Sequence, residues 1–379
     1  MALPSSEALR SRHDAIRAAL DVLSLDALIV TNLTNIRYLS NHVGSAGVVV
    51  LTRDALHLVV DFRYEAAIDT LQASASACPS LTRWPVSGSY DEALVDCLIS
   101  IGLTTVGFEA TDLTVARHDW LTRTLAARGE SIALRSTERV VEQARLVKDA
   151  SEIATIREAA ARLTGVADVT FRSVRAGVSE RDVARILEGA MRDAGYERLA
   201  FETIVASGPN GAFPHYRAGD RLLARGDLVV LDFGGVLDGY CCDLTRTVSV
   251  GVPSEEARRI YDAVRDAQQA AIAVVQPGVH ASAIDAAARD LLQSRGLGEA
   301  FGHGTGHGLG LDVHEEPRVT RHRPDLPVVS LEPGMIFTIE PGAYIPGWGG
   351  VRIEDDILVT DSGCDVLTDI SRELLSLEN

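Results

Sequence analysis

Apolar and polar positions alternate in two different ways along the chain. Up to about residue 140, short apolar runs rich in β-branched residues are separated by stretches with helical periodicity. This pattern predicts strands over residues 27–31, 47–51, 56–60 and 105–108, and helices over residues 5–22, 62–73, 90–100 and 114–128. Alternating helices and strands are typical of an α/β domain, which we place at residues 1–142.

Residues 143–379 combine longer helices with strands and turns. Asp149-Ala-Ser-Glu152 has the spacing of a capping box and predicts a helix that ends near Gly177. Further helices are predicted over residues 179–195, 254–275 and 282–296. Because strands and turns lie between and after these helices, we expect this second domain to be α+β.

Two segments of the second domain share a pattern of a glycine, an apolar strand and a carboxylate. One runs from residue 226 to Asp232, and the other runs from residue 334 to Glu340. Asp243 follows the first segment and Glu354 follows the second, each after a turn-rich stretch. We interpret these as two related half-domains, each with a hairpin that carries two acids. Facing hairpins would bring the four carboxylates together.

Four carboxylates in one apolar pocket require compensation. Like charges at close range raise carboxyl pKa values until some of the groups are protonated. Divalent cations remove this conflict, and two metals that share carboxylates can activate water and polarise a carbonyl. Carboxylates with an imidazole suit manganese, cobalt or zinc better than metals that prefer thiolates. The acids therefore predict a metal site.

The candidate imidazoles lie in a glycine-rich segment that contains His303, His307 and His314. Their spacings of four and seven residues, amid five glycines, do not suit a helix. They indicate a strand and turn whose backbone closely approaches a ligand. His215 lies in a turn-rich loop ahead of the first acidic segment and is a further candidate.

Composition excludes several classes of protein. The 379-residue chain has a formal net charge of −17, so it repels phosphate backbones and we expect no nucleic-acid partner. No apolar run approaches the roughly 18 residues of a membrane span, and the first 19 residues are too polar for a signal peptide. We therefore expect a cytoplasmic protein without membrane association, whose five cysteines are reduced thiols.

Six motifs of the second domain together resemble the pita-bread metallopeptidases, the family of methionine aminopeptidase, aminopeptidase P, prolidase and the metal-free creatinase. They are LDFGG at 231–235, DLTRT at 243–247, GHGLG at 306–310, VHEEP at 313–317, TIEPG at 338–342 and VRIED at 351–355. RLVKD at 145–149 and, more weakly, NIRYL at 35–39 resemble the Xaa-Pro branch. The resemblance implies an α+β pita-bread domain preceded by a smaller, creatinase-like α/β domain.

By that resemblance, the chain would bind two divalent metal ions, with manganese favoured over cobalt or zinc. The implied ligands are Asp232, Asp243, His307, Glu340 and Glu354, with Asp243 and Glu354 bridging the metals. Creatinase has lost ligands of this set, whereas all five are present here. The resemblance therefore implies hydrolytic metal chemistry.

Charge suggests roles for the remaining candidates. Glu340 would take a proton from the attacking water and pass it to the leaving nitrogen. His314 and His215 would hydrogen-bond the substrate carbonyl, the tetrahedral oxyanion or the product carboxylate. His303 would orient the cluster or relay protons, and Arg352 would hold the acids in place.

Three other residues complete the candidates. Thr245 shares a strand face with Asp243, so we expect its hydroxyl to support a metal ligand. Cys241 lies on the same face but is favoured as a small core residue. His42 is likewise favoured as an ordinary structural residue rather than a group that reaches a neighbouring subunit's cleft.

We predict a dinuclear-metal peptidase that hydrolyses the Xaa-Pro bond of short peptides with proline second, similar to aminopeptidase P, in a homodimer or tetramer. The alternative is a prolidase restricted to dipeptides, which must block the far side of the proline, ideally with a cation for its carboxylate. The large N-terminal domain disfavours methionine aminopeptidase. The complete set of five ligands disfavours a binding module on the same fold.

Overall fold

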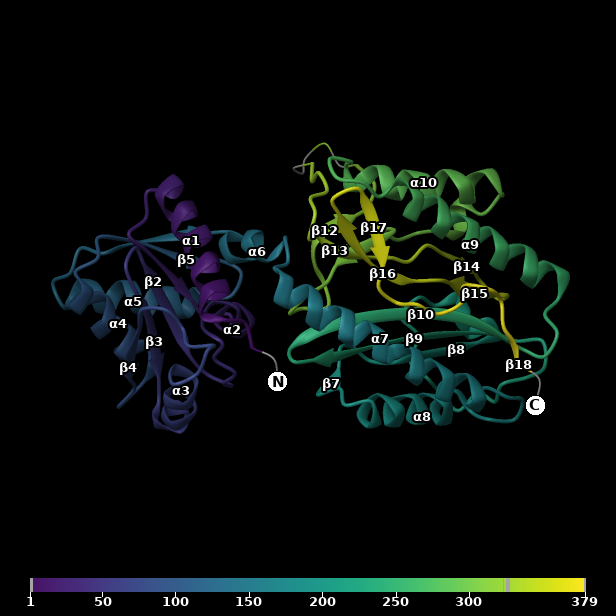
Figure 1. Cartoon of the computed structure of the whole chain (residues 1–379), viewed down its shortest axis with the longest axis horizontal. Helices are drawn as coiled ribbons and strands as arrows, with labels where there is room; N and C mark the ends of the chain where they lie inside the picture. The colour runs from purple at the N-terminus through teal and green to yellow at the C-terminus, as the bar shows by residue number, and fades with distance from the viewer. Residues whose placement is uncertain (1–2, 323, 325–327, 378–379) are drawn as a thin grey trace. The chain divides into compact units, whose positions relative to one another are not determined.

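The computed structural model describes residues 3–322, 324 and 328–377. The chain divides into two compact units, Met1–Arg145 and Leu146–Asn379 (Figure 1). Each unit is described by itself below. Among the described residues, no helix combines the length and the hydropathy of a membrane-spanning segment.

The first unit is built on a mixed six-stranded sheet in the order β4-β3-β2-β1-β5-β6. Its elements are α1 Ser6–Leu23, β1 Ala27–Val30, α2 Leu33–Ser40, β2 Val48–Thr52, β3 Leu56–Val60, η1 Phe62–Tyr64, α3 Glu65–Gln72, β4 Leu81–Pro85, α4 Tyr90–Ile101, β5 Thr105–Glu109, α5 Val115–Ala127, β6 Ala133–Thr137 and α6 Val140–Arg145. The four predicted strands and four predicted helices are all present. The helix expected over residues 62–73 begins as a single 3₁₀ turn, at whose start the side chain of Asp61 accepts a hydrogen bond from Arg63 N.

One core of this unit lies between the sheet and helices α4 and α5. β1 and β2 are buried at every position, including the alternate residues that face away from this core, so both faces of the sheet are covered. Ile29 and Val50 on these strands pack in one cluster with Leu94 and Leu98 of α4 and Leu121 of α5. Full burial of an aliphatic side chain stabilises a fold by roughly 1.5–3 kcal/mol, so this cluster holds the layer together.

The second unit contains two helix-on-sheet halves. The first half has α7 Ala150–Ser173, α8 Glu180–Asp193, β7 Arg198–Leu199, β8 Ile204–Ser207, η2 Gly208–Ala212, β9 Leu228–Leu237 and β10 Tyr240–Val250. The second half has α9 Glu255–Val274, α10 Ala281–Ser294, η3 Gly298–Ala300, β11 Gly306–Gly308, β12 Glu315–Val319, β13 Ile336–Ile339, β14 Gly342–Ile345, β15 Gly349–Arg352, β16 Asp355–Thr360 and β17 Gly363–Val366. β18, Ser376–Leu377, returns to pair with β10 in the first sheet.

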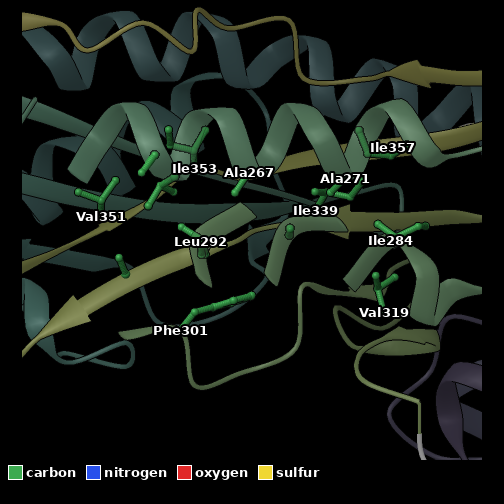
Figure 2. Close-up of a cluster of buried hydrophobic side chains, with 14 of the residues drawn as sticks. Ala267, Ala271, Ile284, Leu292, Phe301, Val319, Ile339, Val351, Ile353 and Ile357 are labelled. Carbon is green, nitrogen blue, oxygen red and sulfur yellow. The ribbon is translucent and has the colours of Figure 1, made fainter. Parts of the chain in front are cut away.

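Each half has its own hydrophobic core. α7 and α8 pack on the β10-β9-β8 sheet through residues such as Leu163, Leu187 and Phe233. Figure 2 shows the second core, in which Ala267 and Ile284 from helices α9 and α10 lie among strand residues. The capping box predicted at Asp149 is formed and starts α7. The two half-domains inferred from the sequence therefore correspond to two helix-on-sheet halves, each with its own core.

The first acidic hairpin is formed as predicted, whereas the second differs. β9 and β10 pair antiparallel and carry Asp232 and Asp243. In the second half, β13 pairs with β16, and the β14–β15 hairpin is inserted between them as a separate two-stranded sheet. Glu340 and Glu354 lie just outside strands β13 and β16. Pro341 follows Glu340 and has no N–H to donate to the ladder, so the chain leaves the sheet there.

Candidate metal centre

The first two acids are held on one face of the β9–β10 hairpin. In the strand register Asp232 lies opposite Thr245, and Asp243 lies opposite Gly234. Opposed residues share a face and alternate residues along a strand share it too, so all four positions face the same side. A Cβ at Gly234 would lie 2.3 Å from the Cys242 carbonyl oxygen and 2.7 Å from the Phe201 ring, so glycine is needed there.

His307 meets these acids from an interior strand of the second half. It lies on β11, and its Nε2 is 3.9 Å from Asp243 Oδ2 and 3.5 Å from Glu340 Oε1. Asp243, His307 and Glu354 each offer one ligand atom, and these atoms lie within 4.8 Å of one another. All three residues are buried. The two half-domains thus converge on one cluster of oxygen and nitrogen donors.

The glycine-rich segment forms the predicted strand at 306–308, and the two glycines beside His307 closely approach neighbouring backbone. A Cβ at Gly306 would lie 1.9 Å from the Thr338 carbonyl oxygen. A Cβ at Gly308 would lie 2.0 Å from the Glu316 carbonyl oxygen. At these two positions the backbones of β13 and of β12, where the β11–β12 register shifts after His307, leave no room for a Cβ.

The neutral imidazole of His307 has an unprotonated nitrogen, Nε2, that faces the acids. Burial lowers the pKa of His307 to about 4, so its imidazole is neutral near pH 7. Nδ1 lies 3.0 Å from the Gly308 carbonyl oxygen, which can only accept, so Nδ1 carries the proton and donates it. Nε2 is then unprotonated and cannot donate to Asp243 or Glu340. A cation between them satisfies both partners.

The negative charges of the acids are also poorly compensated by the protein alone. Burial, followed by the charges of neighbouring carboxylates, raises the pKa values of Asp243 and Glu354 well above their usual range. Burial raises the pKa of Glu340 to about 8. Asp243 Oδ1 is buried without a hydrogen-bond partner among the described residues. An orphaned carboxylate oxygen beside a neutral imidazole fits a divalent cation with oxygen and nitrogen ligands.

Thr245 and Arg352 form hydrogen bonds that hold two of the acids in place. Thr245 Oγ1 donates to Glu354 Oε2 at 2.6 Å, which confirms the predicted hydroxyl support of a candidate ligand. Arg352 Nε donates to Thr245 Oγ1 at 3.1 Å, and Arg352 Nη2 donates to Asp232 Oδ2. Arg352 is 4% exposed, and Thr245 is completely buried. One cation therefore links an acid of each half-domain.

Sequence reasoning missed Tyr344, which joins this support to His303. Its hydroxyl accepts from Arg352 Nη1 at 2.8 Å and lies 2.9 Å from His303 Nε2. Nδ1 of His303 lies 2.7 Å from the Gly304 carbonyl oxygen and must donate to it, so Nε2 accepts from Tyr344. Burial lowers the pKa of His303 to about 4. A lone tyrosine on an apolar strand carries no sequence signal for this contact.

All nine candidate residues line one cavity of about 910 Å³. His314 and His215 are exposed on its walls, in contrast to His307. The His314 ring lies 4.3 Å from the His307 ring, centroid to centroid, and is steeply inclined to it. Phe201, Ile204, Tyr216, Arg217 and Arg318 also line the cavity and were not singled out by their sequence context.

The two residues that were favoured as structural are buried away from this cavity's lining. Cys241 is 2% exposed, and its thiol points to the Leu311 carbonyl oxygen at 3.9 Å. His42 is 5% exposed, and its Nε2 lies 3.1 Å from the Ala46 carbonyl oxygen. Its ring packs edge-on against Tyr64. Both side chains are thus held by contacts within their own units.

Comparison with known proteins matches this geometry. Residues 154–361 match metallopeptidase family M24, and residues 12–147 match the creatinase/prolidase N-terminal domain. Peptidase YqhT of Bacillus subtilis, an uncharacterized peptidase, is 38% identical over 96% of this chain and 99% of its own length. The chain belongs to metallopeptidase family M24 and is a metallopeptidase with the pita-bread fold that the motifs implied.

Two solved structures share the complete architecture. The Xaa-Pro dipeptidase from Bacillus anthracis superposes with a TM-score of 0.90 at 35% identity, covering 97% of this chain and 100% of its own. The X-Pro aminopeptidase from Thermotoga maritima superposes with a TM-score of 0.83 at 31% identity, covering 96% of this chain and 99% of its own. The fold alone is therefore common to an enzyme named a dipeptidase and one named an aminopeptidase.

Proposed function

We propose that this metallopeptidase hydrolyses the bond between an N-terminal residue and a following proline, and that free Xaa-Pro dipeptides are its preferred substrates. The observation that carries the preference for dipeptides is a cation in the wall of the cavity. The sequence alone favoured peptides of two or more residues. The placement of Arg318 now favours the prolidase alternative.

Arg318 lies on β12 directly opposite His307 and lines the cavity. Its side chain is exposed and forms no ion pair with any described residue. Its charge lowers the pKa values of both His307 and His314, after the larger effect of burial, so it lies close to both rings. A free guanidinium near the reacting groups is suited to a carboxylate, which it can bind through two parallel hydrogen bonds.

Five residues are proposed to hold two divalent ions: Asp232, Asp243, His307, Glu340 and Glu354, with Asp243 and Glu354 shared. When bound, the ions supply positive charge that favours deprotonation of water and polarises the scissile carbonyl. Arg352 and Thr245 keep Asp232 and Glu354 in place through the hydrogen bonds described above.

Glu340 is the proposed general base and acid. Its side chain is 18% exposed, compared with 6% for Asp243 and 11% for Asp232, so it is the most accessible of these three acids to water in the cavity. It takes a proton from the attacking water and delivers it to the proline nitrogen as the C–N bond breaks. The exposed imidazoles of His314 and His215 donate hydrogen bonds to the oxygen that becomes negatively charged.

Proline suits this cavity because the ring has a fixed φ and its nitrogen carries no N–H in a peptide bond. Phe201, Ile204 and Tyr216 give one side of the cavity an apolar lining against which a pyrrolidine ring can pack. A residue without this ring would make less apolar contact with the lining.

Longer peptides are the second candidate substrates. The cavity volume of about 910 Å³ lies near the upper end of the ~300–1,000 Å³ usual for ligand sites, so it has room beyond a dipeptide. The relative from Thermotoga maritima is named an X-Pro aminopeptidase. The two candidates differ in whether the proline carboxylate contributes to binding.

Hydrolysis of Ala-Pro, Ala-Pro amide and Ala-Pro-Ala by metal-reconstituted protein distinguishes them. We expect Arg318→Met to lower kcat/KM for Ala-Pro by about 10- to 100-fold through loss of a charged hydrogen bond, and to leave Ala-Pro amide unchanged. Arg217→Met is the matched control, because Arg217 lines the same cavity but pairs with Glu202 at 3.0 Å. Equal losses on the acid and the amide would refute the role of Arg318. Cleavage of Ala-Pro-Ala in preference to Ala-Pro would favour the aminopeptidase.

A further inference from the structure

One wall of the cavity is a loop that lies between β8 and β9. The loop starts at Ser207, passes through the 3₁₀ turn η2 and carries Pro214, His215, Tyr216 and Arg217 into the lining. No described residue makes a hydrogen bond to the His215 imidazole. The position of that ring therefore depends on how the loop backbone is held.

A single carboxylate binds both ends of this loop. Glu180, the first residue of α8, is completely buried. Its Oε1 accepts from Ser207 N at 2.8 Å, from Ser207 Oγ at 2.6 Å and from Asn210 Nδ2 at 2.9 Å. Its Oε2 accepts from Gly219 N at 3.2 Å. Ser207 and Asn210 lie before His215 and Gly219 lies after it, so Glu180 closes the loop.

Further hydrogen bonds hold the part of the loop next to His215. Asn210 Nδ2 also donates to the Tyr216 hydroxyl at 2.8 Å, and Tyr216 is adjacent to His215 in the chain. The backbone of α8 adds a second connection, because Arg181 N donates to the Gly219 carbonyl oxygen at 3.0 Å. At the other side of the loop, Arg352 Nη1 donates to the Pro214 carbonyl oxygen at 3.4 Å.

The base of the loop also packs backbone to backbone on β15. A Cβ at Gly211 would lie 2.8 Å from Gly350 N, and a Cβ at Gly350 would lie 2.0 Å from the Gly211 carbonyl oxygen. β15 ends at Arg352, which donates to Asp232. The backbone contact with β15 therefore holds the loop base beside the candidate metal ligands without involving Glu180, whose own contacts fix the two ends of the loop.

We propose that Glu180 is a positioning residue that acts on hydrolysis through His215, by fixing both ends of the loop that carries it. This inference rests on the proposed function for its kinetic consequence. Glu180 does not line the cavity, so it affects the reaction only through the loop. The buried carboxylate is needed in its charged form because it accepts four hydrogen bonds and donates none.

Glu180→Gln is the informative variant, since it preserves size and burial. An amide offers one oxygen and one NH₂ group. If its oxygen stays on the Ser207 side, the NH₂ group meets the N–H of Gly219, and two donors face each other. One end of the loop is thereby released, whereas Glu180→Ala would also leave a cavity and threaten folding.

The control is Glu188→Gln on the same helix, because Glu188 makes no hydrogen bond to the loop. Trypsin cleavage after Arg217, whose side chain is 82% exposed, reports loop release without reference to activity. We expect Glu180→Gln to speed this cleavage and to lower kcat for Ala-Pro by about 10- to 100-fold, less than complete loss of a strong oxyanion donor. Bound metal should stay unchanged, and Glu188→Gln should behave as wild type.

A double-mutant cycle with His215→Ala separates positioning from general destabilisation. If Glu180 acts through His215, Glu180→Gln has little further effect on kcat in the His215→Ala background. Equal losses of kcat in both backgrounds, or unchanged trypsin cleavage in Glu180→Gln, would overturn the proposal. Failure of wild-type protein to cleave Ala-Pro would instead refute the proposed function, and the cleavage at Arg217 would still report whether Glu180 holds the loop.

Discussion

Replacement of Thr245 by valine tests whether residues that hydrogen-bond to the acids determine metal affinity. The substitution nearly preserves shape and removes the hydroxyl that donates to Glu354 at 2.6 Å and accepts from Arg352 at 3.1 Å. A hydrogen bond to a charged group contributes about 1.5–3 kcal/mol. If that energy holds Glu354 in its ligand geometry, metal affinity falls by about 10- to 100-fold, the range typical of residues that orient metal ligands.

Thr247→Val is the matched control, two residues further along β10 on the same face. Thr247 is also buried, but its hydroxyl donates to the Arg352 carbonyl oxygen at 2.9 Å and accepts from Arg352 N at 3.1 Å. It touches no acid. Both variants lose buried hydrogen bonds and should unfold at lower temperature than wild type, whereas only Thr245→Val should bind metal more weakly.

Affinity is measured by titrating chelated protein with Mn²⁺ against a fluorescent competitor, alongside thermal unfolding of the same metal-free samples. We expect both variants to lose similar amounts of thermal stability, whereas only Thr245→Val should lose metal affinity. Wild-type affinity in Thr245→Val would refute the reasoning that the Thr245–Glu354 hydrogen bond organises the centre. Equal affinity losses in both variants would show that general destabilisation of β10, and not this hydrogen bond, lowers the metal affinity.

Three further outcomes are expected. Glu340→Gln should nearly abolish turnover, because an amide cannot take the proton; substantial kcat in metal-loaded variant would contradict this role. His314→Ala should lower kcat but retain most of the metal, and metal analysis showing its loss would mean that His314 is a ligand. The folded pKa of His303 is lowered to about 4, so its stabilising contribution is present above pH 6.5 and lost as the pH falls from 6.5 to 4. The difference in Tm between chelated wild type and His303→Gln should therefore shrink over that window, and a constant difference would argue against it.

Much of the fold could be predicted because the periodic patterns are long or strongly apolar. α7, α8 and α9 have capping side chains at their N-termini and extended amphipathic faces, and the buried strands of the first unit are apolar runs. α2 was missed because eight residues give little more than two turns of pattern. β4 was missed because an edge strand with exposed positions shows no continuous apolar run.

The site was predicted where its residues lie in local motifs and missed where they meet through the fold. The acids and His307 belong to recognisable strand-and-glycine segments, and they line one cavity. Glu180 and Tyr344 show no such signal, because their partners are distant in sequence: Glu180 contacts Gly219, and Tyr344 contacts His303. The second hairpin was misjudged because spacing alone does not reveal that β14 and β15 form a separate sheet.

The most direct test of the account is hydrolysis of Ala-Pro and Ala-Ala by the same protein before and after chelation. The account predicts that wild-type protein loses Ala-Pro hydrolysis when metal is removed, regains it with Mn²⁺, and cleaves Ala-Ala far more slowly throughout. Undiminished Ala-Pro hydrolysis by metal-free protein, or equal cleavage of Ala-Ala by the reconstituted protein, would contradict it.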